Sequence, residues 1–199
     1  MNKRTDQKEK TRENILKVAL ELYARNGIAV TTTAEIAIKS QVSHGTIFAH
    51  FPTKECLIEE VISKFGTTVI MRLHELIDLQ CGMKEVLMTH LQVINEFEEL
   101  YIRLITEVPL LDSNVNYTLI GMQSTLSFHI AQVAEREMIE GMIKNMPLHL
   151  LFNTWIGLVH YYLINKELFA PDEKVITRYG SELIDHFMNL ISVEGGEVR

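Results

Sequence analysis

The chain is poor in the residues that break helices or cross-link a polypeptide. Its 199 residues include only four prolines and two cysteines. Few prolines leave long helices possible, because proline removes a backbone donor and clashes with the preceding turn. Cys56 and Cys81 lie far apart and form no Cys-x-x-Cys or Cys/His ligand pattern. We therefore expect reduced thiols, with neither a disulfide framework nor a metal site.

Catalytic and membrane signatures are also missing. There is no Gly-x-Ser-x-Gly, no phosphate-binding loop and no Gly-x-Gly-x-x-Gly, so we expect neither an enzyme nor a bound cofactor. The first ten residues are polar and charged, unlike a signal peptide. The most apolar later stretch, 148–164, is interrupted by His149, Asn153 and His160 and falls short of a membrane span. We expect a cytoplasmic protein with no membrane partner.

Charge is unevenly distributed along the chain. The formal net charge is -7, yet residues 1–54 carry nine Lys/Arg and five Asp/Glu, whereas the remainder carries ten and twenty-one. A positive end beside a negative remainder is typical of a protein in which one part meets phosphate and the other stays away from it.

Apolar residues recur at helical spacing, and no stretch of useful length alternates with the period of a strand. This pattern predicts an all-α protein, with an N-terminal three-helix domain at residues 1–53 joined by a long helix to a larger helical domain at 54–199. We expect residues 1–10 to be a frayed arm. The helices are expected at residues 11–25, from 33 for about two turns, and at 44–50, 53–79, 84–108, 117–144, 148–168 and 173–191.

The stretch from residue 31 to 51 carries the clearest local signals. Thr32 followed by Glu35 forms a capping box, which starts a short helix. Ser43 offers a second N-cap for another short helix. Two helices joined by about three residues make a helix-turn-helix. The inward residues would be Val42, Ile47 and Phe51, and the outward ones His44, Gly45, Thr46, Ala49 and His50.

The run IAIKSQVSHGTIFAHFPTKECL at residues 36–57 resembles the TetR family of bacterial transcriptional regulators. Three positions depart from the family pattern: Ser40-Gln41 replaces Ala-Gly, Phe48 replaces Tyr, and Thr53 replaces Ser. Gln41 puts the turn geometry in question, because glycine most easily adopts positive φ. The matching residues are Ile36, Ala37, Val42, Ser43, Gly45, Thr46, His50, Phe51, Lys54, Glu55 and Leu57.

The resemblance implies roles for individual residues on double-stranded DNA. Ser43, His44 and Thr46 are expected nearer the bases, where sequence is read, and Gly45 would let the backbone approach the groove. Simple solvent exposure of His44 is the alternative. The expected backbone-positioning residues are Thr32, Phe48, His50 and Lys54.

The last two expected helices carry apolar stripes that could serve a homodimer. The helix at 148–168 is apolar on most sides and therefore needs a second cover. The alternative is packing within one chain, but the resemblance favours a two-fold dimer on a palindrome. The candidate dimer residues are Leu151, Leu158, Tyr162, Leu183, Phe187 and Ile191.

An effector pocket is harder to place, because aromatic and Met residues at helical spacing also form ordinary core. No strong basic cluster appears after residue 54, so an apolar or cationic small molecule fits better than a large anion. His90, His129 and Asn153 could orient it. The candidate lining residues are Phe97, Tyr101, Met122, Phe128 and Trp155.

These observations predict a ligand-responsive DNA-binding transcriptional regulator. By resemblance, it would be a repressor that binds a palindromic operator as a dimer until a small molecule releases it. The alternative is a helical small-molecule binding or interaction protein with weakened or lost DNA binding, which Gln41 and Phe48 leave open.

Overall fold

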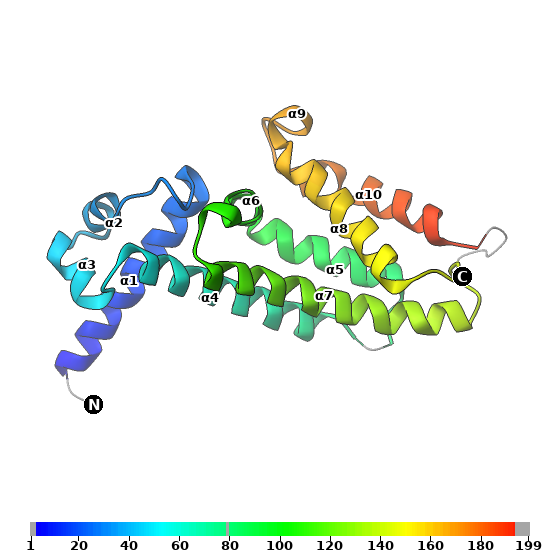
Figure 1. Ribbon diagram of the computed structural model, residues 1–199, viewed down its shortest axis with the longest axis horizontal. Helices are drawn as coiled ribbons and strands as arrows, with labels where there is room; N and C mark the ends of the chain where they lie inside the picture. The colour runs from blue at the N-terminus through cyan, green and yellow to red at the C-terminus, as the bar shows by residue number, and fades with distance from the viewer. Residues whose placement is uncertain (1–2, 79, 194–199) are drawn as a thin grey trace. The chain divides into compact units, whose positions relative to one another are not determined.

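The computed structural model describes residues 3–78 and 80–193 (Figure 1). The described residues contain no β-strand, and an isolated antiparallel bridge joins Ile143 to Ser192. This confirms the predicted all-α class. None of the described helices is both long and apolar enough for a membrane span. The helices are α1 Lys3–Asn26, α2 Thr33–Ser40, α3 His44–His50, α4 Lys54–Leu76, α5 Met83–Glu96, α6 Glu98–Glu107, the 3-10 helix η1 Val108–Leu110, α7 Ser113–Ile139, α8 Leu148–Ile164, α9 Lys166–Phe169 and α10 Val175–Ile191.

The chain forms two compact units. The first comprises Met1–Thr68 with Glu99–Ile120, and the second comprises Val69–Glu98 with Gly121–Arg199. The predicted domain boundary between residues 53 and 54 divides the chain by role, with DNA reading before it and ligand binding after it. This boundary remains a prediction.

The first unit is built on a core between α1, α2 and α3. Helix α1 contacts α2, and α2 contacts α3. Ile15, Ala19 and Tyr23 follow one another at four-residue spacing on α1 and are fully buried. Ile36 of α2 and Ile47 of α3 are equally buried. Each fully buried aliphatic side chain stabilises the fold by roughly 1.5–3 kcal/mol, so this core fixes the two short helices.

The segment 99–120 completes this unit. The Glu107 carboxylate accepts a hydrogen bond from the Ala29 N–H at 2.8 Å, and the Arg103 guanidinium donates to the Arg25 carbonyl at 3.3 Å. Gly27 adopts φ 108°, and a Cβ there would lie 2.8 Å from Glu107 Oε1. The turn after α1 is therefore shaped to receive the Glu107 side chain.

The second unit is organised around α10, which packs on α5 and on α8. Helix α5 lies close to Gly180, where a Cβ would be 3.3 Å from Ile176 Cγ2 and 3.4 Å from Leu91 Cδ1. The start of α10 has no side-chain cap from its own sequence. Instead, the buried Glu98 carboxylate accepts hydrogen bonds from the Val175 and Ile176 N–H groups, both at 2.9 Å.

Several predicted helix limits were wrong. The helix expected at 117–144 runs from Ser113 to Ile139, and the one expected to reach residue 79 ends at Leu76. The single helix expected at 84–108 is divided at Phe97 into α5 and α6, which places Glu98 at the start of α10. The helix expected at 148–168 ends at Ile164, where Asn165 begins a separate turn, α9. Residues 3–10 belong to α1 and are not a frayed arm. Asp6 and Lys10 stand there at the i,i+4 spacing that favours a helix.

Candidate nucleic-acid interface

The start of α2 is fixed by a capping box. Thr32 Oγ1 accepts the Glu35 N–H at 3.2 Å, and the Glu35 carboxylate accepts the Thr32 N–H at 2.7 Å. The hydrogen bonds from the Thr32 backbone and hydroxyl lower the pKa of Glu35. The predicted capping box is confirmed, and Thr32 is exposed beside it.

The turn between α2 and α3 keeps the geometry that glycine would adopt. Gln41 lies in the left-handed region, at φ 58° and ψ 40°. Its N–H donates to the Ile38 carbonyl at 3.1 Å, and the Val42 N–H donates to the Ala37 carbonyl at 3.0 Å. This pair of bonds is the Schellman motif, which normally places Gly at that position. The departure from the family pattern has left the turn intact, with a left-handed residue that carries a Cβ.

Helix α3 begins with a second side-chain cap. Ser43 Oγ accepts the Thr46 N–H at 3.1 Å and lies 2.8 Å from Thr46 Oγ1. Ile47 and Phe51 are buried, as expected of the inner face. Among the predicted DNA-binding residues, Ser43, His44, Gly45 and Phe48 are exposed, and Thr46, His50 and Lys54 are half-buried.

The His44 side chain is engaged by its neighbours. Its Nε2 lies 2.9 Å from Thr33 Oγ1, across the turn at the start of α2. Its ring meets the Phe48 ring edge to face, with the centroids 5.0 Å apart. Thr33 was missed from the sequence, because nothing in residue spacing indicates that the first residues of α2 and α3 touch.

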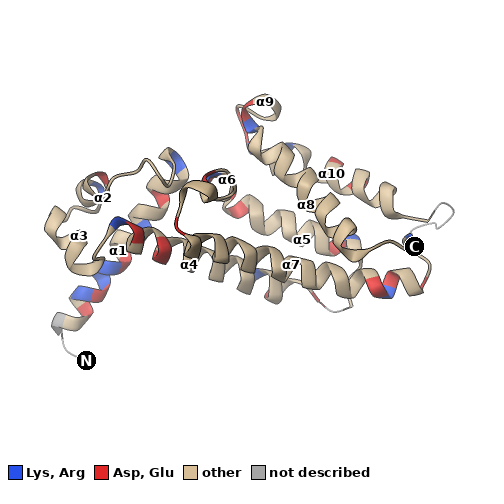
Figure 2. Ribbon diagram, viewed as in Figure 1, with Lys and Arg blue, Asp and Glu red and all other residues tan. Residues whose placement is uncertain are grey.

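Charged groups of α1 lie near the end of α3, which has no Lys, Arg, Asp or Glu of its own. Figure 2 shows charged residues along α1. Burial lowers the pKa of His50, and the positive charges of Lys8 and Arg12 lower it further. The first turns of α1 therefore place cations near the end of α3. The exposed Lys8 is a candidate phosphate contact that sequence reasoning did not name.

Arg12 connects α1 to α4 and to the end of α3. Its guanidinium forms two hydrogen bonds with the Glu60 carboxylate of α4. It also lies over the Phe51 ring, 4.6 Å from the centroid. Such a charge, already paired and stacked, is better suited to holding α1, α3 and α4 together than to binding DNA.

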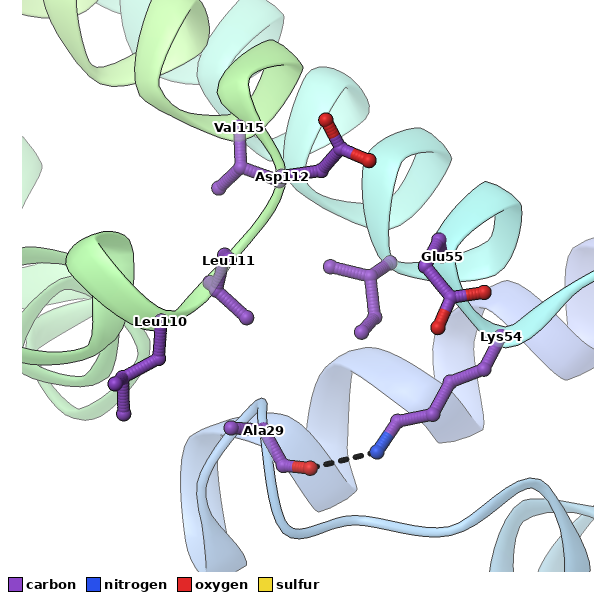
Figure 3. A pocket seen from close by; sticks show the side chains of 8 residues that line it. Ala29, Lys54, Glu55, Leu110, Leu111, Asp112 and Val115 are labelled. Carbon is purple, nitrogen blue, oxygen red and sulfur yellow. Dashed lines mark hydrogen bonds between the residues drawn. The ribbon is translucent and has the colours of Figure 1, made fainter.

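Lys54 points inward at the start of α4. Its Nζ donates to the Ala29 carbonyl at 2.6 Å (Figure 3). The helix is capped by Thr53, whose hydroxyl accepts the Cys56 N–H at 3.1 Å. Ala29 is thus bound twice, by Lys54 at its carbonyl and by Glu107 at its N–H.

A cavity of about 150 Å³ lies beside this bond in the first unit. Its size is below the roughly 300–1,000 Å³ of typical ligand pockets. None of the predicted effector residues lines it. Figure 3 shows its lining residues, which are Ala29, Lys54, Glu55, Ile58, Leu110, Leu111, Asp112 and Val115.

The predicted effector residues belong to both units and differ in burial. Tyr101 belongs to the first unit and is buried. In the second unit Met122 and Trp155 are buried, Phe97 is half-buried and Phe128 is exposed. Trp155 has a defined polar partner, since its Nε1–H donates to His90 Nδ1 at 3.1 Å. Its ring also contacts that of Phe187, with the centroids 5.2 Å apart.

The predicted dimer residues divide by burial. Leu158 and Tyr162 are half-buried. The other four, Leu151, Leu183, Phe187 and Ile191, are buried within the chain itself. A different face of α8 is open to solvent, and sequence reasoning missed it although its members recur at helical spacing. The exposed face of α8 consists of Leu150, Thr154, Gly157, Tyr161 and Ile164, with the exposed His149 and Asn153 beside it.

Residues 15–61, which contain the helix-turn-helix, match the family model described as bacterial regulatory proteins, tetR family. The helix-turn-helix of this chain is therefore similar to that of TetR-family regulators. The HTH-type transcriptional repressor Rv3405c of Mycobacterium tuberculosis is 39% identical over 67 residues, which cover 34% of this chain and 36% of the relative. The match therefore spans about a third of that repressor.

Solved structures extend the similarity to the fold of both units. A TetR-family regulator from Agrobacterium tumefaciens superimposes with a TM-score of 0.76 at 18% identity, covering 94% of this chain and 100% of that one. FadR from Bacillus subtilis, solved in complex with stearoyl-CoA, gives a TM-score of 0.67 at 18% identity, covering 88% and 97%. The TetR-family fold thus covers nearly the whole chain.

Proposed function

We propose that this chain is a ligand-responsive transcriptional repressor that binds a palindromic double-stranded DNA operator as a homodimer and is released by a small molecule. The observation that carries the proposal is the capped, uncharged outer face of α3 within a TetR-family domain. Residues 1–53 would read DNA, and residues 54–199 would bind the ligand and dimerise.

In this proposal α3 lies in the major groove, where every base pair presents a distinct pattern of donors and acceptors. Ser43, His44 and Thr46 supply the hydroxyl and imidazole groups nearest the bases. The side chains that would hold the protein on the sugar-phosphate backbone are Thr32, Phe48, His50 and Lys54. The Lys54 ammonium has three N–H donors, so it can hold Ala29 and still approach a phosphate.

Gly45 supports close approach to DNA. A Cβ at this position would meet only Ser43 Oγ, at an ordinary 3.8 Å. Nothing within the described protein therefore requires glycine there, and alanine would favour the helix by about 1 kcal/mol. We expect Gly45→Ala to raise thermal stability and weaken operator binding. Wild-type affinity in Gly45→Ala would contradict the groove assignment.

The test begins with selection of a DNA sequence from a random library, followed by fluorescence anisotropy at several salt concentrations. A phosphate-neutralising protein shows a linear fall of log affinity with log salt. We expect His44→Ala and Thr46→Ala to lose affinity for the selected operator. The matched control Thr67→Ala, an exposed position of α4, should not. A wild-type chain with neither sequence preference nor salt dependence would instead be a helical small-molecule binding or interaction protein.

The exposed face of α8 supports the dimer. Tyr161 is 58% exposed and Ile164 is 50% exposed. The opposite face of α8 is buried within the chain. A two-fold partner covering the exposed face would align two reading heads on two half-sites. Ile164→Glu should yield monomers in light scattering and weaken operator binding. Met88→Glu, a similarly exposed apolar position on α5, is the matched control, and equal loss in both variants would contradict this interface.

An apolar or cationic effector is proposed for the second unit. The complex of FadR with stearoyl-CoA supports ligand response in this fold. Coupling of about 1–3 kcal/mol between effector and DNA would give roughly 5- to 150-fold release. Trp155 is the one tryptophan of the chain, so its fluorescence can screen compounds. A compound that changes Trp155 emission should also lower operator affinity, and ligands that bind without any such effect would contradict the regulatory role.

A further inference from the structure

We propose that Thr33 determines the base preference of His44 by holding its imidazole in one orientation. Thr33 is the first residue of α2 and His44 the first of α3, and Thr33 Oγ1 lies 2.9 Å from His44 Nε2. The inference rests on the proposed DNA-binding function and goes further, because it names a specificity-determining residue outside the reading helix.

Two contacts constrain the ring. The hydrogen bond to Thr33 engages Nε2, and the Phe48 ring, one turn later on α3, meets the imidazole at an interplanar angle of 77°. An exposed histidine without such contacts samples several rotamers and must lose that freedom on binding. Here the ring is ordered before DNA arrives.

The consequence for recognition follows from imidazole chemistry. A neutral imidazole has one donor nitrogen and one acceptor nitrogen. With Nε2 engaged by Thr33, Nδ1 is the nitrogen left to meet a base edge. A donor there would suit the N7 or O6 of guanine, and an acceptor would suit the amino group of cytosine or adenine. In either tautomer, the Thr33 hydroxyl fixes where Nδ1 is presented and hence which base pair it meets.

The contacts around Thr33 favour this role over a structural one. The capping of α2 is carried by Thr32 and Glu35, so it does not need the Thr33 hydroxyl. The Thr33 side chain is only half-buried. Thr33→Val keeps the shape and removes the hydroxyl, while Thr33→Ser keeps the hydroxyl.

The test measures binding to the selected operator and to variants at the base pair whose preference His44→Ala abolishes. We expect Thr33→Val to reduce discrimination at that base pair by about five- to tenfold, in line with the loss of one specific contact. Thr33→Ser should retain it. In the His44→Ala background Thr33→Val should have no further effect, because Thr33 acts through His44.

Other results would overturn the inference. A uniform loss of affinity on all sequences, persisting in the His44→Ala background, would make Thr33 a phosphate contact. Unchanged discrimination in Thr33→Val would remove any role for it. A wild-type chain without base preference would refute the proposed function itself. In the free protein, imidazole ¹⁵N spectra should show one His44 tautomer in the wild type and a mixture in Thr33→Val, and identical spectra would contradict the ordering by Thr33.

Discussion

Replacing Gln41 by glycine should stabilise the chain, because Gln41 adopts a left-handed conformation that its Cβ disfavours. Among the described residues it is the one non-glycine residue with positive φ, at 58°. Its side chain is exposed, so removing it sacrifices little packing. The backbone bonds of the Schellman motif, from Gln41 to Ile38 and from Val42 to Ala37, would remain.

The magnitude is a difference between two effects. A left-handed residue with a Cβ costs roughly 1–2 kcal/mol. Glycine loses more conformational entropy on folding, which offsets roughly 0.5–1 kcal/mol of this stabilisation. We expect Gln41→Gly to gain about 1 kcal/mol, which for a chain of this size raises the melting temperature by roughly 2–4 °C.

The assay is thermal and denaturant unfolding followed by circular dichroism at fixed protein concentration. Gln41→Ala keeps a Cβ at the same φ and should show no comparable gain. Lys39→Gly, inside α2, tests glycine in an ordinary helical position and should lose about 1 kcal/mol. If Gln41→Gly unfolds at the same point as Gln41→Ala, the strain assigned to this turn is refuted.

Three further predictions concern buried polar groups. The Ser40 hydroxyl is buried without a hydrogen-bond partner among the described residues, so Ser40→Ala should raise stability in denaturant titrations by about 1 kcal/mol, and an unchanged midpoint would contradict this. Glu98→Gln weakens the carboxylate cap of α10 and should lower stability by about 2 kcal/mol, whereas the exposed control Glu182→Gln should not. Burial lowers the pKa of His90 to about 3 and that of His160 to about 4. Both stay neutral when folded and take up protons when unfolded, so stability should be full above about pH 6.5 and fall below it by up to about 2.7 kcal/mol per pH unit. Constant stability between pH 6.5 and 5 would exclude this linkage.

The all-α class and the helix-turn-helix could be predicted because their signals are local. The cap of α2 depends on Thr32 and Glu35, three residues apart, and the cap of α3 on Ser43 and Thr46. Such contacts form within one helical turn, so residue order alone places the partners together. The inward positions Ile47 and Phe51 follow from helical periodicity in the same way.

Only the tertiary structure decided the contacts between distant residues. Glu98 caps α10 from 77 residues away. This cap lies at the break between α5 and α6, two helices that periodicity alone had predicted as one. Glu107 binds Ala29 across 78 residues, which brings the segment 99–120 into the unit that holds α3.

The same distinction explains the effector and dimer residues. The sequence of α8 is apolar on most sides, and periodicity shows which residues share a face but not which face the chain itself covers. Folding buries Leu151 and Trp155 and leaves Tyr161 and Ile164 open. The sequence by itself determined the all-α class and the helix-turn-helix, through contacts within a few residues. The tertiary structure decided which apolar face is core and which stays exposed, because that depends on how distant helices pack.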